Sequence, residues 1–426
     1  MILNSKRYDG TNRGLEMATE IKKDVKKILS RVWFTELDNE VSGSSQRDPL
    51  GLQSIWAYYG GRVIKHITTV SNDIRGFRET LLCLDICSKY QNEKNDDRYS
   101  YKELILCFEE LFIYSAIKKD KENHTEKARG LIGYDNGRSK FESSRRNPVI
   151  SPQNTVLASQ ISLGYYGRYK TPLYSMSIIN GMNRVHSKFI NVPSLYGDIQ
   201  YQELYKAFKI FMDKRSVKTF DSFTGVDYMV DAVCGPFREG EKEFWLERLQ
   251  VSGKDEDILM RECYERLSED NTPEQLLSAL REHPEVNDIL CVEPYLLCVE
   301  EVFYKMLSNG NVSAIKFDSE KHYSRLQEFK SASKPERPAA DSLSRKYNLL
   351  LKLDPHEETY LYKIYEYHKK VCEYKGSGSW LNIENDSIQQ MVQMNVSVDL
   401  DEWNRNYYLR AFKDIKDSIK RIENGE

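Results

Sequence analysis

The chain has 426 residues, long enough for two or three domains, and its 40% hydrophobic and 30% charged residues are typical of a folded protein. It contains no run of about 18 apolar residues and begins without an apolar signal-peptide core, so we expect a cytoplasmic protein with no membrane partner. The eight cysteines include no C-x-x-C pair, which indicates reduced, buried thiols rather than a zinc or disulfide framework. We therefore expect no metal and no cofactor.

Helical signals begin near the N-terminus, where apolar residues recur at helical spacing over residues 14–33. In the stretch "DPLGLQSIWAYYGG", Asp48-Pro49 is an N-cap and first-turn pair that predicts a short helix. Gly60-Gly61 is expected to end that helix at a positive φ angle. Residues 62–70 are β-branched and extended in character, and the next helix is expected to follow them.

Capping boxes predict three further helix starts, at Ser100–Glu103, Thr272–Gln275 and Asp354–Glu357. A long amphipathic helix is expected over residues 399–422. Strand signals are few, and the best is a hairpin between Trp380 and Met391 that turns at Asn385-Asp386. The sequence thus predicts a mainly α, multi-helix, two- to three-domain globular protein with at most a small β-hairpin near the C-terminus.

Polar, proline-containing stretches set the expected domain boundaries. The predicted units are an N-terminal helical domain (1–142), a basic connector (143–197), a partly acidic helical domain (198–330), a linker or exposed loop (331–345) and a C-terminal helical domain with the hairpin (346–426).

Charge is distributed unevenly along the chain, although the net charge is only −3. Residues 143–196 contain six basic and no acidic residues, a net of +6. Residues 239–301 contain 18 acidic and 6 basic residues, a net of −12. Because local fields steer partners, the basic region is expected to attract anions and the acidic region to repel them.

The segment "LGYYGRYKTPLY" interleaves aromatic and basic residues inside the basic region. Single-stranded nucleic acid stacks its bases on aromatic rings and pairs its phosphates with cations. The candidate DNA- or RNA-binding residues are Arg145, Arg146, Tyr165, Tyr166, Arg168, Tyr169, Lys170, Arg184 and Lys188. The alternative is a glycine-rich turn whose tyrosines pack on a helix and whose cations are solvated.

A second candidate is an anion cluster made of Arg62, Lys65, His66 and Arg75, at the start of a predicted helix where backbone N–H groups favour phosphate. The glycines nearby do not follow the pattern of a nucleotide P-loop. We favour the alternative, in which this stretch is a packing junction between two helices.

Catalytic motifs are not recognisable in the sequence. Glu373-x-Lys375 has half of a metal-dependent nuclease signature but lies in a helical pattern, where such a site requires a strand. H-E-x-x-H and G-x-S-x-G are both absent from the sequence. We therefore expect no enzymatic activity.

Two apolar-aromatic stripes, one with Tyr360 and Tyr367 and the other with Trp403 and Tyr407, follow helical spacing. Core packing is the default interpretation of both stripes. If a stripe is exposed, it becomes a partner-binding face.

The stretches "DPLGLQ", "TTVSNDIRGF", "SQISLGYYGRYKTPL" and "WNRNYYLRAF" together resemble bacterial proteins encoded in phage-defence, DNA-restriction-like loci. They cover under a fifth of the chain and contain no catalytic motif. The resemblance implies a subunit that works with other proteins in a defence or DNA-processing assembly, and it assigns no role to any residue.

These observations favour a non-enzymatic scaffold or adaptor subunit of a multi-protein bacterial assembly, in phage defence or DNA processing, whose basic region contacts nucleic acid or an acidic partner. A stand-alone nucleic-acid-binding module is the alternative. An enzyme with a dispersed, unrecognised site is the third hypothesis.

Overall fold

The computed structural model describes residues 48–94, 98–187, 190–252, 257–268, 271–338, 341–392, 403 and 405–425. The helix expected at residues 14–33 and the candidate residue Lys188 lie outside these ranges. Across the described ranges the chain is mainly helical with one two-stranded sheet, which confirms the predicted fold class.

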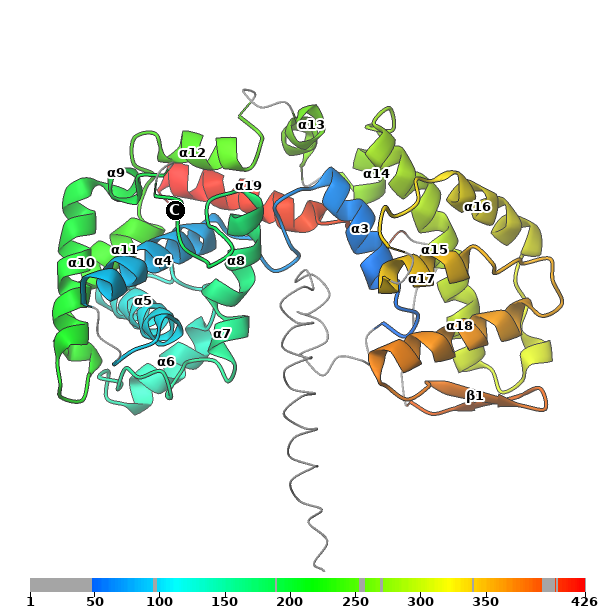
Figure 1. Ribbon diagram of the computed structural model, residues 1–426, viewed down its shortest axis with the longest axis horizontal. Helices are drawn as coiled ribbons and strands as arrows, with labels where there is room; N and C mark the ends of the chain where they lie inside the picture. Colours follow the sequence, from blue (N-terminus) through cyan, green and yellow to red (C-terminus); the bar gives the residue numbers. More distant parts are fainter. Residues whose placement is uncertain are drawn as a thin grey trace, which may run out of the picture.

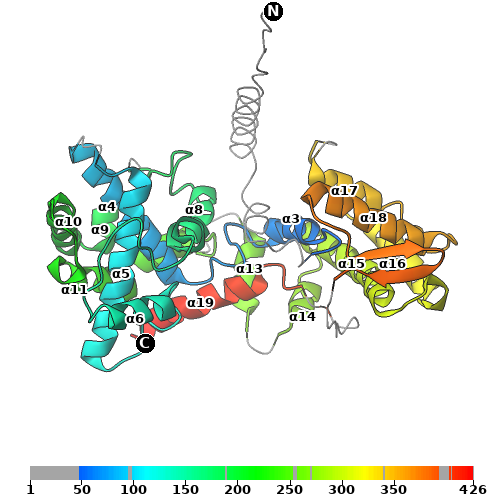
Figure 2. The ribbon, with the colours of Figure 1, turned by 90° about the horizontal axis from the view of Figure 1, so that it is seen from below.

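The helices form two lobes, seen at the left and right of Figure 1. The first lobe contains α4 (Ile74–Lys94), α5 (Tyr101–Asn123), α6 (Tyr134–Ser143), α7 (Gln160–Leu163), α8 (Tyr165–Ser175), α9 (Val192–Tyr196), α10 (Asp198–Asp213), the 3-10 turn η1 (Phe220–Ser222), α11 (Val226–Cys234) and α12 (Glu241–Arg248). The second lobe contains α3 (Gln53–Val63), α14 (Pro273–Ser278), α15 (Pro284–Ser308), η2 (Val312–Ala314), α16 (Ser319–Ser331), α17 (Ser342–Leu350), α18 (Tyr360–Lys375), β1 (Leu381–Glu384) and β2 (Ser387–Gln390). Helix α13 (Ile258–Arg266) lies between the lobes, and α19 (Leu409–Asn424) runs from there along the first lobe (Figure 2).

The chain crosses between the lobes three times, and this path departs from the predicted domain boundaries. Helix α3 packs on α15 and α17 of the second lobe, the next helix α4 belongs to the first lobe, and α19 returns from the second lobe to pack on α4 and α13. Residues 143–197 do not connect two domains, because α7, α8 and α9 pack on α4 and α5 within the first lobe.

Two of the three predicted capping boxes are confirmed. Ser100 caps α5 and Thr272 caps α14, each with the reciprocal bond of the box. The third prediction is wrong, because α18 begins at Tyr360 and the Asp354 carboxylate instead accepts the His356 N–H within a turn (3.0 Å).

The predicted hairpin is confirmed. Strands β1 and β2 are antiparallel, and Ile383 lies opposite Ile388. The turn residues Asn385 and Asp386 have φ angles of 48° and 69°, which Asn and Asp tolerate better than other side chains.

Helix α3 does not end at the two glycines as predicted, but continues to Val63. Gly60 lies directly against Tyr407 and Tyr408, where an added Cβ would sit 3.1 Å from the Tyr408 ring. The glycine therefore allows close packing and does not terminate the helix. Asp48 is not the N-cap as predicted, because α3 begins at Gln53 with Leu52 at the N-cap position, although the Asp48 carboxylate does accept the backbone N–H groups of Leu52 (2.9 Å) and Gln53 (3.3 Å).

The C-terminal helix is shorter than predicted and begins at Leu409. Tyr407 and Tyr408 have positive φ angles of 46° and 66°, which a right-handed helix cannot accommodate. Within the described ranges, every helix is too short or too polar to cross a lipid bilayer.

Candidate functional site

The tyrosines of the candidate nucleic-acid segment are buried in the first lobe. Tyr165, Tyr166 and Tyr169 lie on α8 with 2%, 5% and 1% of their surfaces exposed. The Tyr169 ring packs edge-on against Phe77, with the ring centroids 4.8 Å apart. Because these rings are not open to a base, the stacking surface expected from the sequence is corrected to a core contact.

The glycines around these tyrosines allow close approach of neighbouring groups. A Cβ on Gly164 would collide with the Glu109 carboxylate, and a Cβ on Gly76 would collide with the Tyr169 ring. The glycine-aromatic pattern in the sequence is thus the signature of tight packing between α4, α5 and α8.

Glu109 takes the place of a local cap at the start of α8. Gly164, at the N-cap position of α8, has no side chain that could cap the helix. Instead Glu109, which lies on the neighbouring helix α5, accepts the Tyr166 N–H at its Oε1 (2.6 Å). Glu109 Oε2 accepts the amide of Gln160 (2.5 Å). A carboxylate at a helix N-terminus satisfies backbone donors and interacts favourably with the helix dipole. Burial nevertheless raises the pKa of Glu109 to about 7.

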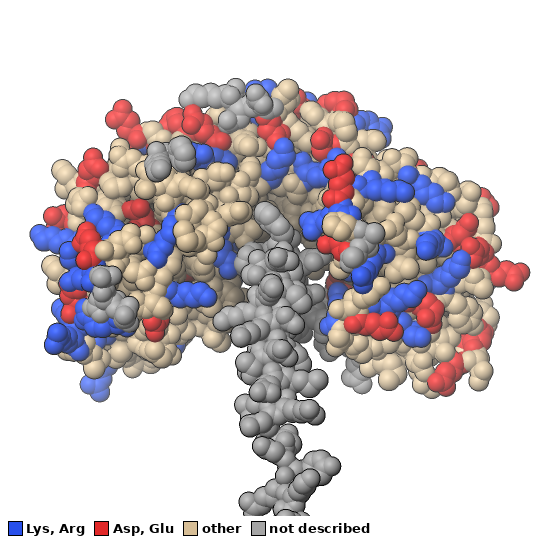
Figure 3. Space-filling model, in the orientation of Figure 1, with Lys and Arg blue, Asp and Glu red and all other residues tan. Residues whose placement is uncertain are grey.

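The basic residues of the candidate set lie on separate elements. Arg145 and Arg146 are exposed after α6, with φ angles of 55° and 66°, and Arg146 lies 3.7 Å from the Glu142 carboxylate. On the face seen in Figure 3, cations are interspersed with acidic residues over both lobes. Among the described cations of this candidate set, Arg145 and Arg146 are exposed and the others are half-buried.

The other candidate cations make local contacts in the first lobe. Arg168 donates to the Leu163 carbonyl oxygen (2.9 Å), and Lys170 lies 5.1 Å from the centre of the Tyr166 ring. Arg184 stacks on the Tyr101 ring at 3.5 Å, a cation–π contact between a loop and α5.

The predicted anion cluster is not assembled. Its three permanent cations are each paired with a carboxylate: Arg62 with Asp288, Lys65 with Asp257 and Arg75 with Asp73. His66 lies 3.1 Å from the Ser175 hydroxyl, and burial lowers its pKa, which favours the neutral ring. This arrangement agrees with the interpretation favoured from the sequence, in which the stretch is a packing junction between two helices.

The two aromatic stripes are largely core. Tyr360, Tyr367 and Tyr407 are at most 2% exposed, and the half-buried Trp403 packs on Tyr407 with ring centroids 6.0 Å apart. Buried rings offer no docking face, so the partner-binding expectation for these stripes is corrected to the default interpretation of core packing.

A charged network that the sequence did not reveal links α15 to the segment before α19. Arg405 pairs with Glu293 (2.9 Å) and with Glu300 (2.6 Å), and the Tyr407 hydroxyl donates to Glu293 (2.5 Å). The two contacts of Glu293 join residues 112 and 114 positions apart in the chain, and sequence spacing carries no signal for such a contact.

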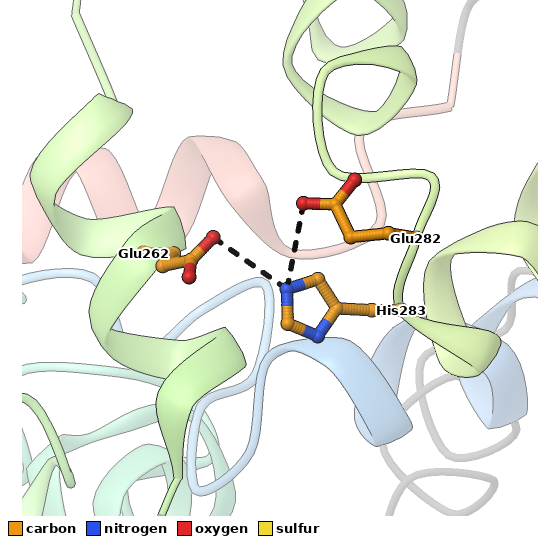
Figure 4. Close-up of side chains that lie close together, drawn as sticks. All are labelled: Glu262, Glu282 and His283. Atoms are coloured by element: carbon orange, nitrogen blue, oxygen red, sulfur yellow. Dashed lines mark ion pairs between the residues drawn. The ribbon is translucent and has the colours of Figure 1, made fainter.

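Glu262, Glu282 and His283 form the one cluster of three potential metal-ligating groups among the described residues (Figure 4). The His283 ring nitrogen Nε2 lies 3.5 Å from Glu262 and 3.9 Å from Glu282. These ion pairs connect α13 to the residues before α15. All three side chains are partly or fully exposed, which is typical of surface ion pairs.

The outer face of α10 exposes large apolar side chains. Ile199 and Ile210 are 77% and 52% exposed and lie about three turns apart on the same side of the helix. Glu203 and Lys206 lie between them on this side, 4.0 Å apart. Helix α10 lies at the outer edge of the first lobe in Figures 1 and 2.

The chain matches no protein-family model, no curated protein and no solved structure.

Proposed function

We propose that the protein is a non-enzymatic scaffold or adaptor subunit of a multi-protein assembly, of the kind that the resemblance to phage-defence proteins implies. The outer face of α10 carries this proposal. Two isoleucines with more than half of their surfaces exposed would gain free energy from burial against a partner. Charged residues between them would fix the register of that partner.

We therefore propose α10 as the partner-binding face, rather than the buried stripes of α18 and of the chain segment before α19. A face with apolar ends and a charged middle suits a protein partner with an apolar surface better than it suits nucleic acid. The buried tyrosines of α8 give no support to single-strand stacking.

The test is affinity capture of the tagged full-length protein from its native host at physiological salt, with and without nuclease. We expect a defined protein partner that survives nuclease and is lost with the double variant Ile199→Glu, Ile210→Glu. The matched control is Met391→Glu, which changes an equally exposed apolar residue (63%) after β2 of the second lobe. Surface substitutions of this kind change stability by only about 0.5 kcal/mol, so folding is retained.

Two outcomes would contradict the proposal. One is a partner that binds the double variant as tightly as the unaltered protein. The other is recovery of nucleic acid alone, lost as salt rises and abolished by Arg145→Glu with Arg146→Glu, which would favour the nucleic-acid-binding alternative.

A further inference from the structure

A cavity of about 670 Å³ lies between α4, the start of α9 and α10 of the first lobe. This volume is in the range of small-ligand sites, roughly 300–1,000 Å³. Five of its lining residues, from Asp85 to Glu93, come from one side of α4. The rest of the lining is mixed, with apolar Val185, Ile190, Val192 and Pro193 beside polar Ser187, Asn191 and Tyr201.

Asp85 is the half-buried carboxylate of this cavity. Its Oδ2 accepts the Tyr201 hydroxyl (2.5 Å), which fixes the orientation of the carboxylate. No described residue is within hydrogen-bond or ion-pair distance of Oδ1. Burial raises the pKa of Asp85, because the ionised form loses hydration, and the Tyr201 hydrogen bond and the Lys89 charge offset this only in part.

The nearest cation on α4 is directed elsewhere. The Lys89 ammonium lies 4.1 Å from the centre of the Tyr205 ring and donates to Gln202 (3.3 Å). The other carboxylate of the cavity, Glu93, already has a cationic partner in Lys209 (2.7 Å). Asp85 is therefore distinguished from Glu93 by its burial and by having no ion pair with any of the described residues.

We propose that this cavity binds an ammonium or guanidinium group carried on a short aliphatic chain, with Asp85 as its counter-ion. The cation would take the free Oδ1 in a charge-assisted hydrogen bond, which is stronger than a neutral one. The methylene groups of the chain would pack on Val192 and Pro193. Ser88 and Asn92 supply further polar groups along the wall of α4.

Two sources share this chemistry, namely a free alkylamine and a Lys or Arg side chain of a protein. We assign the cavity to a side chain of the protein partner, since Tyr201 belongs to the same helix whose outer face carries Ile199 and Ile210. This assignment rests on the proposed function, whereas the recognition of the cation does not.

Calorimetric titration of the full-length protein near neutral pH tests the cation site directly. The probes are pentylamine, N-acetyl-lysine methylamide and N-acetyl-arginine methylamide, with pentan-1-ol as the uncharged control. We expect binding of the cations but not of the alcohol, weakened at least about tenfold by Asp85→Asn. The matched control Glu93→Gln changes the paired carboxylate of the same cavity and leaves binding unchanged.

A second variant keeps the test decisive if Asp85→Asn disturbs folding. Ser88→Trp retains the carboxylate but fills the cavity, and it is expected to abolish binding while the melting temperature is maintained. Failure of every cation to bind, or equal binding by Asp85→Asn, overturns the cation site. Tighter binding of pentylamine than of both blocked amino acids overturns the assignment to a partner side chain. These titrations need no partner protein, so cation binding can be found even if the capture experiment finds no partner. Equally, the capture experiment can find a partner even if no cation binds.

Discussion

The two lobes differ in their buried titratable groups. The first lobe buries Glu79, Glu109 and Glu110 on α4 and α5 without an ion pair to any described residue, whereas the second lobe buries His322 and His368 on α16 and α18, and its buried acids Asp288 and Glu293 are paired with Arg62 and Arg405. Burial disfavours the charged form of any group, so it raises the pKa of an acid and lowers that of a base. The same physical penalty therefore gives the two lobes opposite responses to pH.

The carboxyl groups make the first lobe sensitive to alkali. Burial raises the pKa of Glu110 to about 8 and that of Glu79 well above its ordinary value, and one oxygen of each has no hydrogen-bond partner among the described residues. The protonated form of these carboxyl groups stabilises the folded chain fully at pH values below about 4.5, the pKa of a glutamic acid in the unfolded chain. That contribution is lost as the pH rises through the raised folded pKa values.

The histidines make the second lobe sensitive to acid. His368 donates from Nδ1 to the Pro49 carbonyl (2.8 Å) and accepts the Trp380 N–H at Nε2 (2.9 Å), an arrangement that requires a neutral ring. His322 lies between Tyr360 and Glu301, both at 3.3 Å. Burial lowers both pKa values, so stability falls as the pH drops below about 6.5, where the unfolded chain takes up protons.

The largest expected effect comes from the one buried acid of the first lobe that does have a cation. Arg78 and Glu241 are both fully buried and are joined by two hydrogen bonds of 2.7 and 3.0 Å. Arg78→Met leaves the Glu241 charge uncompensated and is expected to lower the free energy of unfolding by about 3–5 kcal/mol. Chemical denaturation followed by circular dichroism measures the loss.

The control is the double variant Arg78→Met, Glu241→Gln, which removes both charges and is expected to recover part of the loss. Equal stability of the single variant and the unaltered protein would show that the pair does not hold α4 to α12.

A gain in the free energy of unfolding, of intermediate size, is expected from Glu110→Gln. The amide oxygen can still accept the Ser151 N–H (3.1 Å), while the cost of ionising a buried acid is removed. We expect an increase on the order of 2 kcal/mol at pH 9 and little change at pH 4.5. Hydrogen exchange measured by mass spectrometry should place the gain in the peptides of α4 and α5. A pH-independent effect would mean that Glu110 does not titrate with unfolding.

The smallest expected effect is a change in how steeply the stability of the second lobe falls with decreasing pH. Unaltered protein should lose about 1 kcal/mol per buried histidine between pH 7 and pH 5. His368→Gln lowers stability at pH 7, because glutamine cannot make both backbone bonds, but it should flatten the decline on acidification. The measurement is hydrogen exchange of the α18 peptides at the two pH values. An unchanged slope would assign the acid sensitivity to His322 or to another group.

Local sequence signals predicted the elements whose ends are determined by neighbouring residues. Ser100 and Thr272 cap their helices, and Asn385-Asp386 turns the hairpin, because each of these contacts spans only a few residues. The prediction failed at Asp354, where the same type of capping pattern forms a turn and α18 begins later, at Tyr360.

The candidate sites were less predictable, because a sequence pattern does not reveal which side of a helix is covered. The tyrosines of α8 look like a stacking platform in sequence, yet they contact α4 and α5. Asp85 gave no signal, because its neighbour Tyr201 lies 116 residues further along the chain. The exposed isoleucines of α10 look like ordinary core residues of an amphipathic helix.

The sequence by itself determined that this protein is mainly helical, where several helices begin and where the hairpin turns, since these follow from propensity, capping and turn chemistry over a few residues. Only the tertiary structure decided that α3 and α4 belong to different lobes, that Gly60 and Gly76 are contact points, and that Glu79, Glu109 and Glu110 are buried in one lobe and two histidines in the other. Those features depend on groups far apart in the chain, whose pairing is set by the packing of the whole molecule.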